Sequence, residues 1–110
     1  MALKHADPGQ VIDLKPYGAA LAQKQSVALF KSEDLEVMRL VLLAGKTMPS
    51  HDVEGEITLQ CLEGSVEVST AGATHILDAG RLMYLPGRAP HSLFALENAS
   101  VLVTVALKRT

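Results

Sequence analysis

Aromatic residues are scarce in this sequence: its 110 residues include two tyrosines, two phenylalanines and no tryptophan. Proteins that bind single-stranded nucleic acids stack bases on aromatic side chains, so little material for such a surface is present. Basic clusters are also lacking, because ten Lys and Arg are set against twelve Asp and Glu, with a formal net charge of −2. Binding to phosphates needs concentrated positive charge, which argues against nucleic acids and anionic membranes as partners.

Cysteine is also scarce, and a leader-like sequence and long apolar runs are missing. Cys61 is the single cysteine, so no disulfide can form within the chain, and we expect it to pack as a small core residue. The first ten residues lack the basic, apolar and small-residue succession of a secretion signal. No stretch approaches the roughly 20 apolar residues of a membrane span. We therefore expect a cytoplasmic protein.

The chain has the length and composition of one globular domain. Of its residues, 48% are hydrophobic and 20% charged, which is enough apolar material for one core and argues against disorder. Residues 1–10 contain Asp7, Pro8 and Gly9 and show no apolar pattern. We expect a single domain over residues 1–110, with residues 1–10 as a flexible N-terminal arm.

Short apolar segments recur along the chain, separated by Gly, Pro, Asp or Asn. Their spacing is near the 8–12 residues typical of β-sandwiches and β-barrels, and only residues 17–24 suggest a helical turn. The sequence therefore predicts an all-β protein, a closed or double-sheet barrel that leaves few free strand edges. The predicted strands are residues 11–14, 26–31, 35–43, 57–62, 65–70, 74–77, 81–85, 91–96 and 100–107.

One glycine-bounded segment, residues 45–64, has a distinctive spacing. Gly45 is followed after five residues by His51, and Gly64 closes the segment. This resembles the first signature motif of the cupin superfamily, in which Gly, five residues and His-x-His are followed by a Glu and a closing Gly. Val53 and Ile57 stand where that motif has its second His and its Glu.

A second segment, residues 80–95, resembles the second cupin motif. Gly80, Pro86 and His91 match the pattern Gly, five residues, Pro-x-Gly, two residues, His. Arg88 occupies the place of the usual Gly, with Gly87 one position earlier. Because both motifs are present, separated by residues 65–79, the resemblance implies the cupin fold, a double-stranded β-helix or jelly-roll-like β-barrel.

The resemblance also implies a metal site. Cupin enzymes commonly hold one divalent transition metal, such as Fe, Mn, Ni, Zn or Cu, with three His and one Glu from the two motifs. Here His51 and His91 keep two of the four places, whereas Val53 and Ile57 cannot bind a metal. Glu56, one residue before the expected Glu, is the remaining candidate ligand.

The direction of Glu56 depends on the register of strand 57–62. Side chains alternate across a strand, so Glu56 and Gln60 face one side while Ile57, Leu59 and Cys61 face the other. The apolar set prefers the core, which favours Glu56 and Gln60 outside unless a β-bulge lets Glu56 enter alone. The sequence leaves both registers open.

Three functions remain open. The first is a barrel-mouth pocket that binds a small polar or anionic molecule, with His51, His91, Gln60 and Arg39 as candidate contacts. The second is a metal-dependent enzyme, of oxygenase, isomerase or decarboxylase type, that uses His51 and His91. The third is a structural or partner-binding barrel. The resemblance also implies a homodimer, because many cupins pair through sheet edges, and residues 11–14 could supply such an edge.

Overall fold

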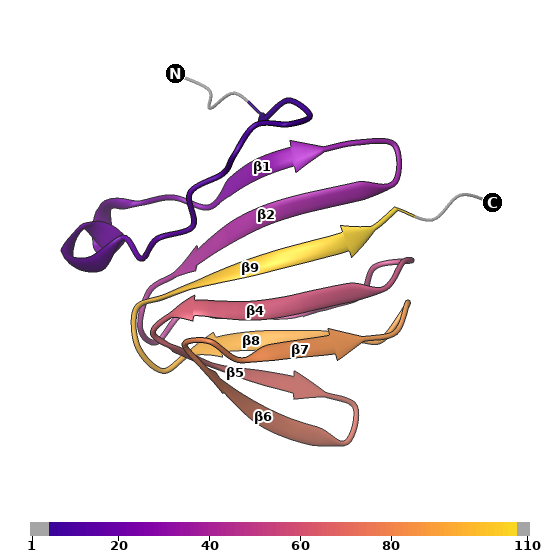
Figure 1. The fold of residues 1–110 in the computed structure, drawn as a ribbon. Helices are drawn as coiled ribbons and strands as arrows, with labels where there is room; N and C mark the ends of the chain where they lie inside the picture. The colour runs from indigo at the N-terminus through magenta and orange to yellow at the C-terminus, as the bar shows by residue number, and fades with distance from the viewer. Residues whose placement is uncertain (1–4, 108–110) are drawn as a thin grey trace.

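The computed structural model describes residues 5–107. No helix among them has the length and apolarity needed to cross a membrane. One short 3-10 helix precedes nine strands (Figure 1). The elements are η1 (Gly18–Gln23), β1 (Val27–Lys31), β2 (Leu35–Leu42), β3 (Thr47–His51), β4 (Ile57–Glu63), β5 (Ser65–Thr70), β6 (Ala73–Asp78), β7 (Leu82–Leu85), β8 (His91–Ala95) and β9 (Ala99–Ala106).

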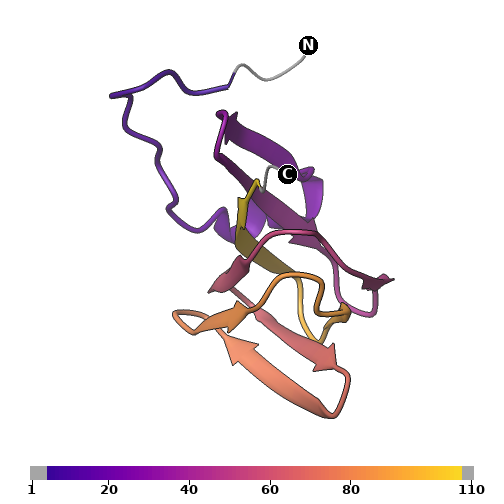
Figure 2. The ribbon, with the colours of Figure 1, turned by 90° about the vertical axis from the view of Figure 1, so that its right-hand side faces the viewer.

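The strands form two antiparallel sheets, one of five strands in the order β1-β2-β9-β4-β7 and one of four in the order β3-β8-β5-β6. Figure 2 shows the N-terminal segment at the β1–β2 end of the molecule, away from the β5–β6 hairpin. Apolar side chains on the inner faces of both sheets form one core, as in other two-sheet β-proteins. The all-β, jelly-roll-like prediction is therefore confirmed.

The register of β4 follows the apolar alternation of its sequence. Ile57, Leu59 and Cys61 are buried, while Thr58 and Gln60 between them are only partly buried. The same alternation operates in β9, which pairs with β4 over most of its length. The register with the apolar set in the core is the one adopted, because a one-residue slip would expose three core side chains.

Two strand predictions were wrong. Residues 11–14 form no strand, and Val11 is almost fully exposed, whereas Thr47–His51 forms β3. The free edge of β1 is contacted instead by Ala6, whose N–H donates to the carbonyl of Leu29 at 2.8 Å. β3 was missed because it is polar and contains Pro49, a residue that only an edge strand accommodates readily.

The expected N-terminal arm is described only in part, since residues 1–4 lie outside the described residues. Residues 5–10 belong to no helix or strand and contain a turn in which the Gln10 N–H donates to the Asp7 carbonyl at 3.0 Å. Because residues 11–14 are not a strand, they offer no sheet edge to a second copy. The homodimer itself stays a prediction.

A buried ion pair fastens the segment before η1 to the outer face of the five-stranded sheet. Arg39 is 2% exposed and donates to the Glu63 carboxylate at 3.0 Å, to Ser100 and to the Lys15 carbonyl. Its guanidinium also lies 3.8 Å from the ring centroid of Tyr17, a cation–π contact. Arg39, proposed from sequence as a ligand contact, is thus paired within the protein.

The Glu63 carboxylate is held in its charged form. Burial alone raises the pKa of Glu63, but hydrogen bonds outweigh burial and lower this pKa below its ordinary value. The donors are the Tyr17 N–H, the Ser100 hydroxyl, the Gly18 N–H and the Arg39 guanidinium. The folded protein therefore binds this proton more weakly than the unfolded chain does.

This pKa shift predicts a loss of stability in acid. The contribution of Glu63 is fully present above the unfolded-state pKa and disappears as the pH falls through the lower folded-state pKa. We expect the free energy of unfolding, measured by urea titration, to begin falling below about pH 5. The fall should be smaller in Glu63→Gln than in the wild type. If Glu63→Gln and the exposed-site control Glu97→Gln showed the same acid dependence, the charge of Glu63 would not be its source.

Candidate functional site

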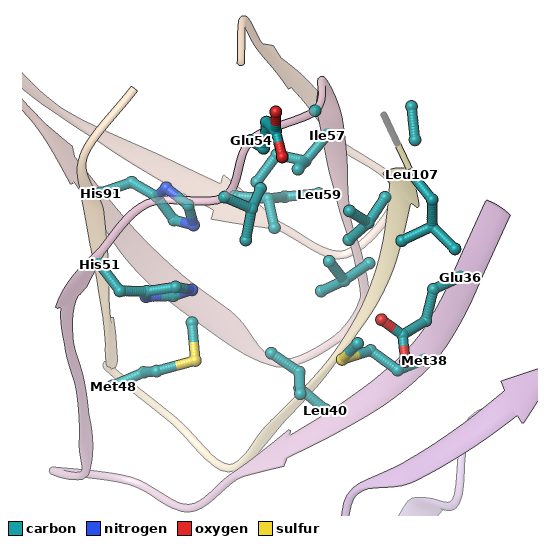
Figure 3. Close-up of a pocket in the computed structure, with 15 residues that line it drawn as sticks. Glu36, Met38, Leu40, Met48, His51, Glu54, Ile57, Leu59, His91 and Leu107 are labelled. Atoms are coloured by element: carbon teal, nitrogen blue, oxygen red, sulfur yellow. The ribbon is translucent and has the colours of Figure 1, made fainter. Parts of the chain in front are cut away.

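A cavity of about 300 Å³ opens between the inner faces of the two sheets. This pocket lies among β2, β3, β4, β8 and β9, and most of its lining is apolar (Figure 3). Its size falls at the lower end of the range typical of small-molecule sites, about 300–1,000 Å³. Its apolar lining includes Met38, Leu40, Met48, Val53, Ile57, Leu59, Val103, Val105 and Leu107.

The two motif histidines meet at one side of this pocket. His51 ends β3 and His91 begins β8, and the two residues are directly paired across these strands. Their ring centroids are 4.5 Å apart and the rings are inclined by 52°. His91 is buried whereas His51 is exposed, so the pair extends from the wall of the pocket to its rim.

An irregularity in the β3–β8 pairing aims His51 inward. Met48 pairs with Leu93 and His51 with His91, so three steps along β3 face two steps along β8. One extra residue in one strand is a β-bulge, and it reverses the facing of the side chains that follow. Met48 and His51 consequently both line the pocket, although an odd spacing places residues on opposite faces of a regular strand.

Both imidazoles are oriented by backbone carbonyls. Nδ1 of His51 lies 3.2 Å from the Pro49 oxygen, and Nδ1 of His91 lies 3.0 Å from the Ala89 oxygen. A carbonyl can only accept a hydrogen bond, so Nδ1 carries the proton in each ring. In the neutral rings Nε2 is then left as an acceptor. Figure 3 shows both rings directed into the pocket.

The metal site implied by the resemblance is not complete in this chain. The remaining two ligand positions, Val53 and Ile57, line the pocket with hydrocarbon side chains. Among residues 5–107 no group of three or more His, Cys, Asp or Glu side chains is placed to hold a metal ion. Two imidazoles alone do not provide the three or four protein ligands of a typical metal site, so the residues present do not fit the implied metal.

The structure does not bring Glu56, Gln60 or Arg39 to the histidines. The Glu56 carboxylate accepts a 2.6 Å hydrogen bond from the exposed Tyr84 hydroxyl and raises the pKa of that phenol. Gln60 lies on the face of β4 opposite Leu59, and Arg39 is sequestered by Glu63. None of the three lines the pocket. The irregularity in the β4–β9 pairing falls between Cys61 and Glu63, past Glu56, so it does not turn Glu56 into the interior.

The altered second motif has a structural explanation. Arg88, in the place of the usual Gly, has a φ of 63°, a left-handed conformation that glycine adopts more easily. Gly87 has an ordinary φ, but a Cβ there would collide with the Glu54 carbonyl oxygen. Position 87 therefore needs a residue without a side chain, because the Glu54 backbone approaches it closely. Position 88 tolerates backbone strain, and the Arg88 side chain forms an ion pair with Glu54 at 3.4 Å.

Sequence reasoning missed Glu36, a carboxylate that lines the pocket. The signal was available in the alternation of β2, because Glu36 shares its face with Met38 and Leu40, which also line the pocket. It was obscured because strand 35–43 is apolar at most positions on both faces. The sequence of β2 alone does not show which of its faces points into the barrel. The pairing of β2 with β9 places the face with Glu36 toward the pocket.

The sequence matches no family model and no curated protein. Solved structures share its architecture. A conserved Streptococcus pyogenes protein of unknown function has a TM-score of 0.77 at 22% identity, over 100% of this chain and 97% of the other. A cupin superfamily protein from Desulfitobacterium hafniense has a TM-score of 0.74 at 12% identity, over 90% and 100%.

A third structure, an RmlC-like cupin protein from Desulfovibrio desulfuricans, has a TM-score of 0.69 at 25% identity, over 94% of this chain and 96% of its own. These three likenesses cover 90–100% of this chain and 96–100% of the other chains. Both motif histidines also lie together at one side of the pocket between the two sheets. The chain therefore has the fold of a small single-domain cupin.

Proposed function

We propose that the pocket binds a small organic molecule with an apolar body, whose polar group donates a hydrogen bond to Nε2 of His51 or His91. The observation that carries this proposal is the placement of two oriented imidazoles at one side of an otherwise apolar cavity. Ligand sites generally combine an apolar lining with a few placed polar groups. Since neutral Nε2 atoms accept hydrogen bonds, the complementary ligand group is a donor, such as a hydroxyl.

Binding without metal chemistry is favoured over the enzyme alternative because hydrocarbon side chains fill the other two ligand positions. Val53 and Ile57 supply neither a proton acceptor nor a metal ligand, and Glu56 is engaged with Tyr84 outside the pocket. The two sites of chemistry that remain are the imidazoles themselves. The imidazoles suit recognition of a polar group on a ligand. Val53 and Ile57 help to enclose the hydrocarbon part of the same ligand.

Binding of 4-phenylbutan-1-ol tests this proposal. We expect saturable binding, with the imidazole ¹⁵N resonances of His51 and His91 shifting in an NMR titration. The double variant His51→Leu/His91→Leu should bind roughly three- to tenfold more weakly, because the hydroxyl has one proton and the hydrogen bond it donates, worth roughly 0.5–1.5 kcal/mol, is lost. The single variant His51→Leu, at the exposed rim, should lose less affinity for the alcohol. It replaces the double variant in this test if the double variant does not fold.

His75→Leu is the matched control, since His75 is an exposed histidine on β6 that does not line this pocket. Its affinity for the alcohol should equal that of the wild type. The proposal fails if the alcohol does not bind, or if the His51 and His91 resonances stay unchanged while the ligand saturates elsewhere.

A further inference from the structure

Glu36 is a carboxylate on the pocket side of β2. Alternation along this strand places Glu36, Met38 and Leu40 on the inner face and buries Val37 and Arg39 on the outer one. Figure 3 shows Glu36 across the pocket from His51 and His91. The apolar pocket therefore has two polar sides, the imidazole pair at one and a half-buried carboxylate at the other.

Three other carboxylates of the barrel have partners within the protein. Glu63 is paired with Arg39, Glu54 with Arg88, and Glu56 accepts from Tyr84. Among residues 5–107, the side chain of Glu36 makes no hydrogen bond or ion pair. Its cross-strand neighbour Lys31 is exposed and forms no ion pair with it. A half-buried charge with no counter-charge is costly, and a bound cation would offset that cost.

The charge of the pocket lining has one sign. Glu36 and Glu54 line the pocket, and no lysine or arginine does. Since Glu54 is already paired with the exposed Arg88, the unbalanced charge belongs to Glu36. Low-dielectric walls strengthen the field of such a charge, which attracts cations and repels anions.

We infer that the ligand of this pocket is an amphipathic amine. Its ammonium group lies against Glu36, its apolar body fills the space beside Met38 and Leu40, and a donor group at its far end reaches His51 and His91. This inference rests on the proposed function and narrows it to cationic ligands. The sequence led us to consider an anionic ligand, because only the histidines were considered there. Glu36 in the pocket favours a cationic ligand instead.

Three ligands share one apolar body and differ in the charge of their polar group, so their affinities show which ligand charge the pocket prefers. They are 4-phenylbutan-1-amine, 4-phenylbutan-1-ol and 4-phenylbutanoate. Affinities are measured by calorimetry at pH 7 and low ionic strength, where screening is weak. The amine should bind at least about tenfold more tightly than the alcohol, because its ammonium makes a charge-assisted hydrogen bond to Glu36 whereas the hydroxyl makes a neutral one to the histidines. The carboxylate should bind most weakly.

Glu36→Gln keeps the shape of the side chain and removes its charge. We expect this variant to lose about tenfold in affinity for the amine while its affinity for the alcohol stays within about twofold. Glu97→Gln, the same change at an exposed turn outside the pocket, should leave all three affinities unaltered.

The inference is overturned if the carboxylate binds as tightly as the amine, or if Glu36→Gln leaves the ratio of amine to alcohol affinity unchanged. In either case alcohol binding sensitive to His51 and His91 would still support the proposed function. Absence of binding by all three ligands would remove the proposed function and this inference together.

Discussion

Gly64→Ala is expected to lower the free energy of unfolding by about 2–5 kcal/mol. Gly64 closes the first motif with a φ of 79°, a left-handed conformation that costs other residues about 1–2 kcal/mol. An added Cβ would also collide with the Asn98 carbonyl oxygen and lie 2.8 Å from the Ala99 Cα, both backbone atoms. Forcing atoms into such a packed place adds typically about 1–3 kcal/mol.

Two other glycines separate these causes in urea unfolding experiments. Gly45 has a similar φ of 83° but open space around the added Cβ, so Gly45→Ala should cost only about 1–2 kcal/mol. Gly72 has neither a positive φ nor a neighbour within 4 Å, and Gly72→Ala should stay within about 0.5 kcal/mol of the wild type. Equal losses for Gly64→Ala and Gly45→Ala would show that close packing at Gly64 contributes nothing.

Glu63→Leu is expected to destabilise the protein by about 3–5 kcal/mol. The change leaves the guanidinium of Arg39, which is 2% exposed, without its counter-ion. It also removes the acceptor for the N–H groups of Tyr17 and Gly18, so the start of η1 loses two of its hydrogen bonds to the sheet. Hydrogen exchange at these two amides should accelerate together with the loss in the free energy of unfolding.

The double variant Arg39→Met/Glu63→Leu should be more stable than Glu63→Leu, because no buried charge then remains unpaired. The exposed pair Glu54–Arg88 is the matched control, and Glu54→Leu should cost no more than about 1 kcal/mol. A double variant as unstable as Glu63→Leu, or a Glu54→Leu of equal cost, would contradict the importance of burial for this ion pair.

Particular residues show why much of the barrel could be predicted. In strand 57–62, Ile57, Leu59 and Cys61 alternate with polar positions, and burial of the apolar set favoured the register that the structure adopts. The motif spacing of Gly45 and Gly64 likewise placed turn glycines where positive φ values occur. These features are local, since each depends on alternation or on the conformation of one residue.

The site depended on contacts between distant segments. His51 faces the pocket only because a bulge at residues 49–50 reverses the side-chain alternation, and β3 itself is a polar edge strand with no apolar pattern to reveal it. Arg39 was a candidate ligand contact until Glu63, 24 residues away in sequence, was seen to pair with it. Such pairings have no signature in a single sequence.

Three features of the sequence were sufficient to predict the fold and the pair His51–His91: the alternation of apolar residues, the turn glycines and the spacing of the two histidine motifs. These features reflect local geometry that is repeated along the chain. Tertiary structure alone decided which charges are neutralised and which face the cavity. It paired Arg39 with Glu63, joined Glu56 to Tyr84 and left Glu36 inside, since those outcomes depend on which face of each strand meets the opposite sheet.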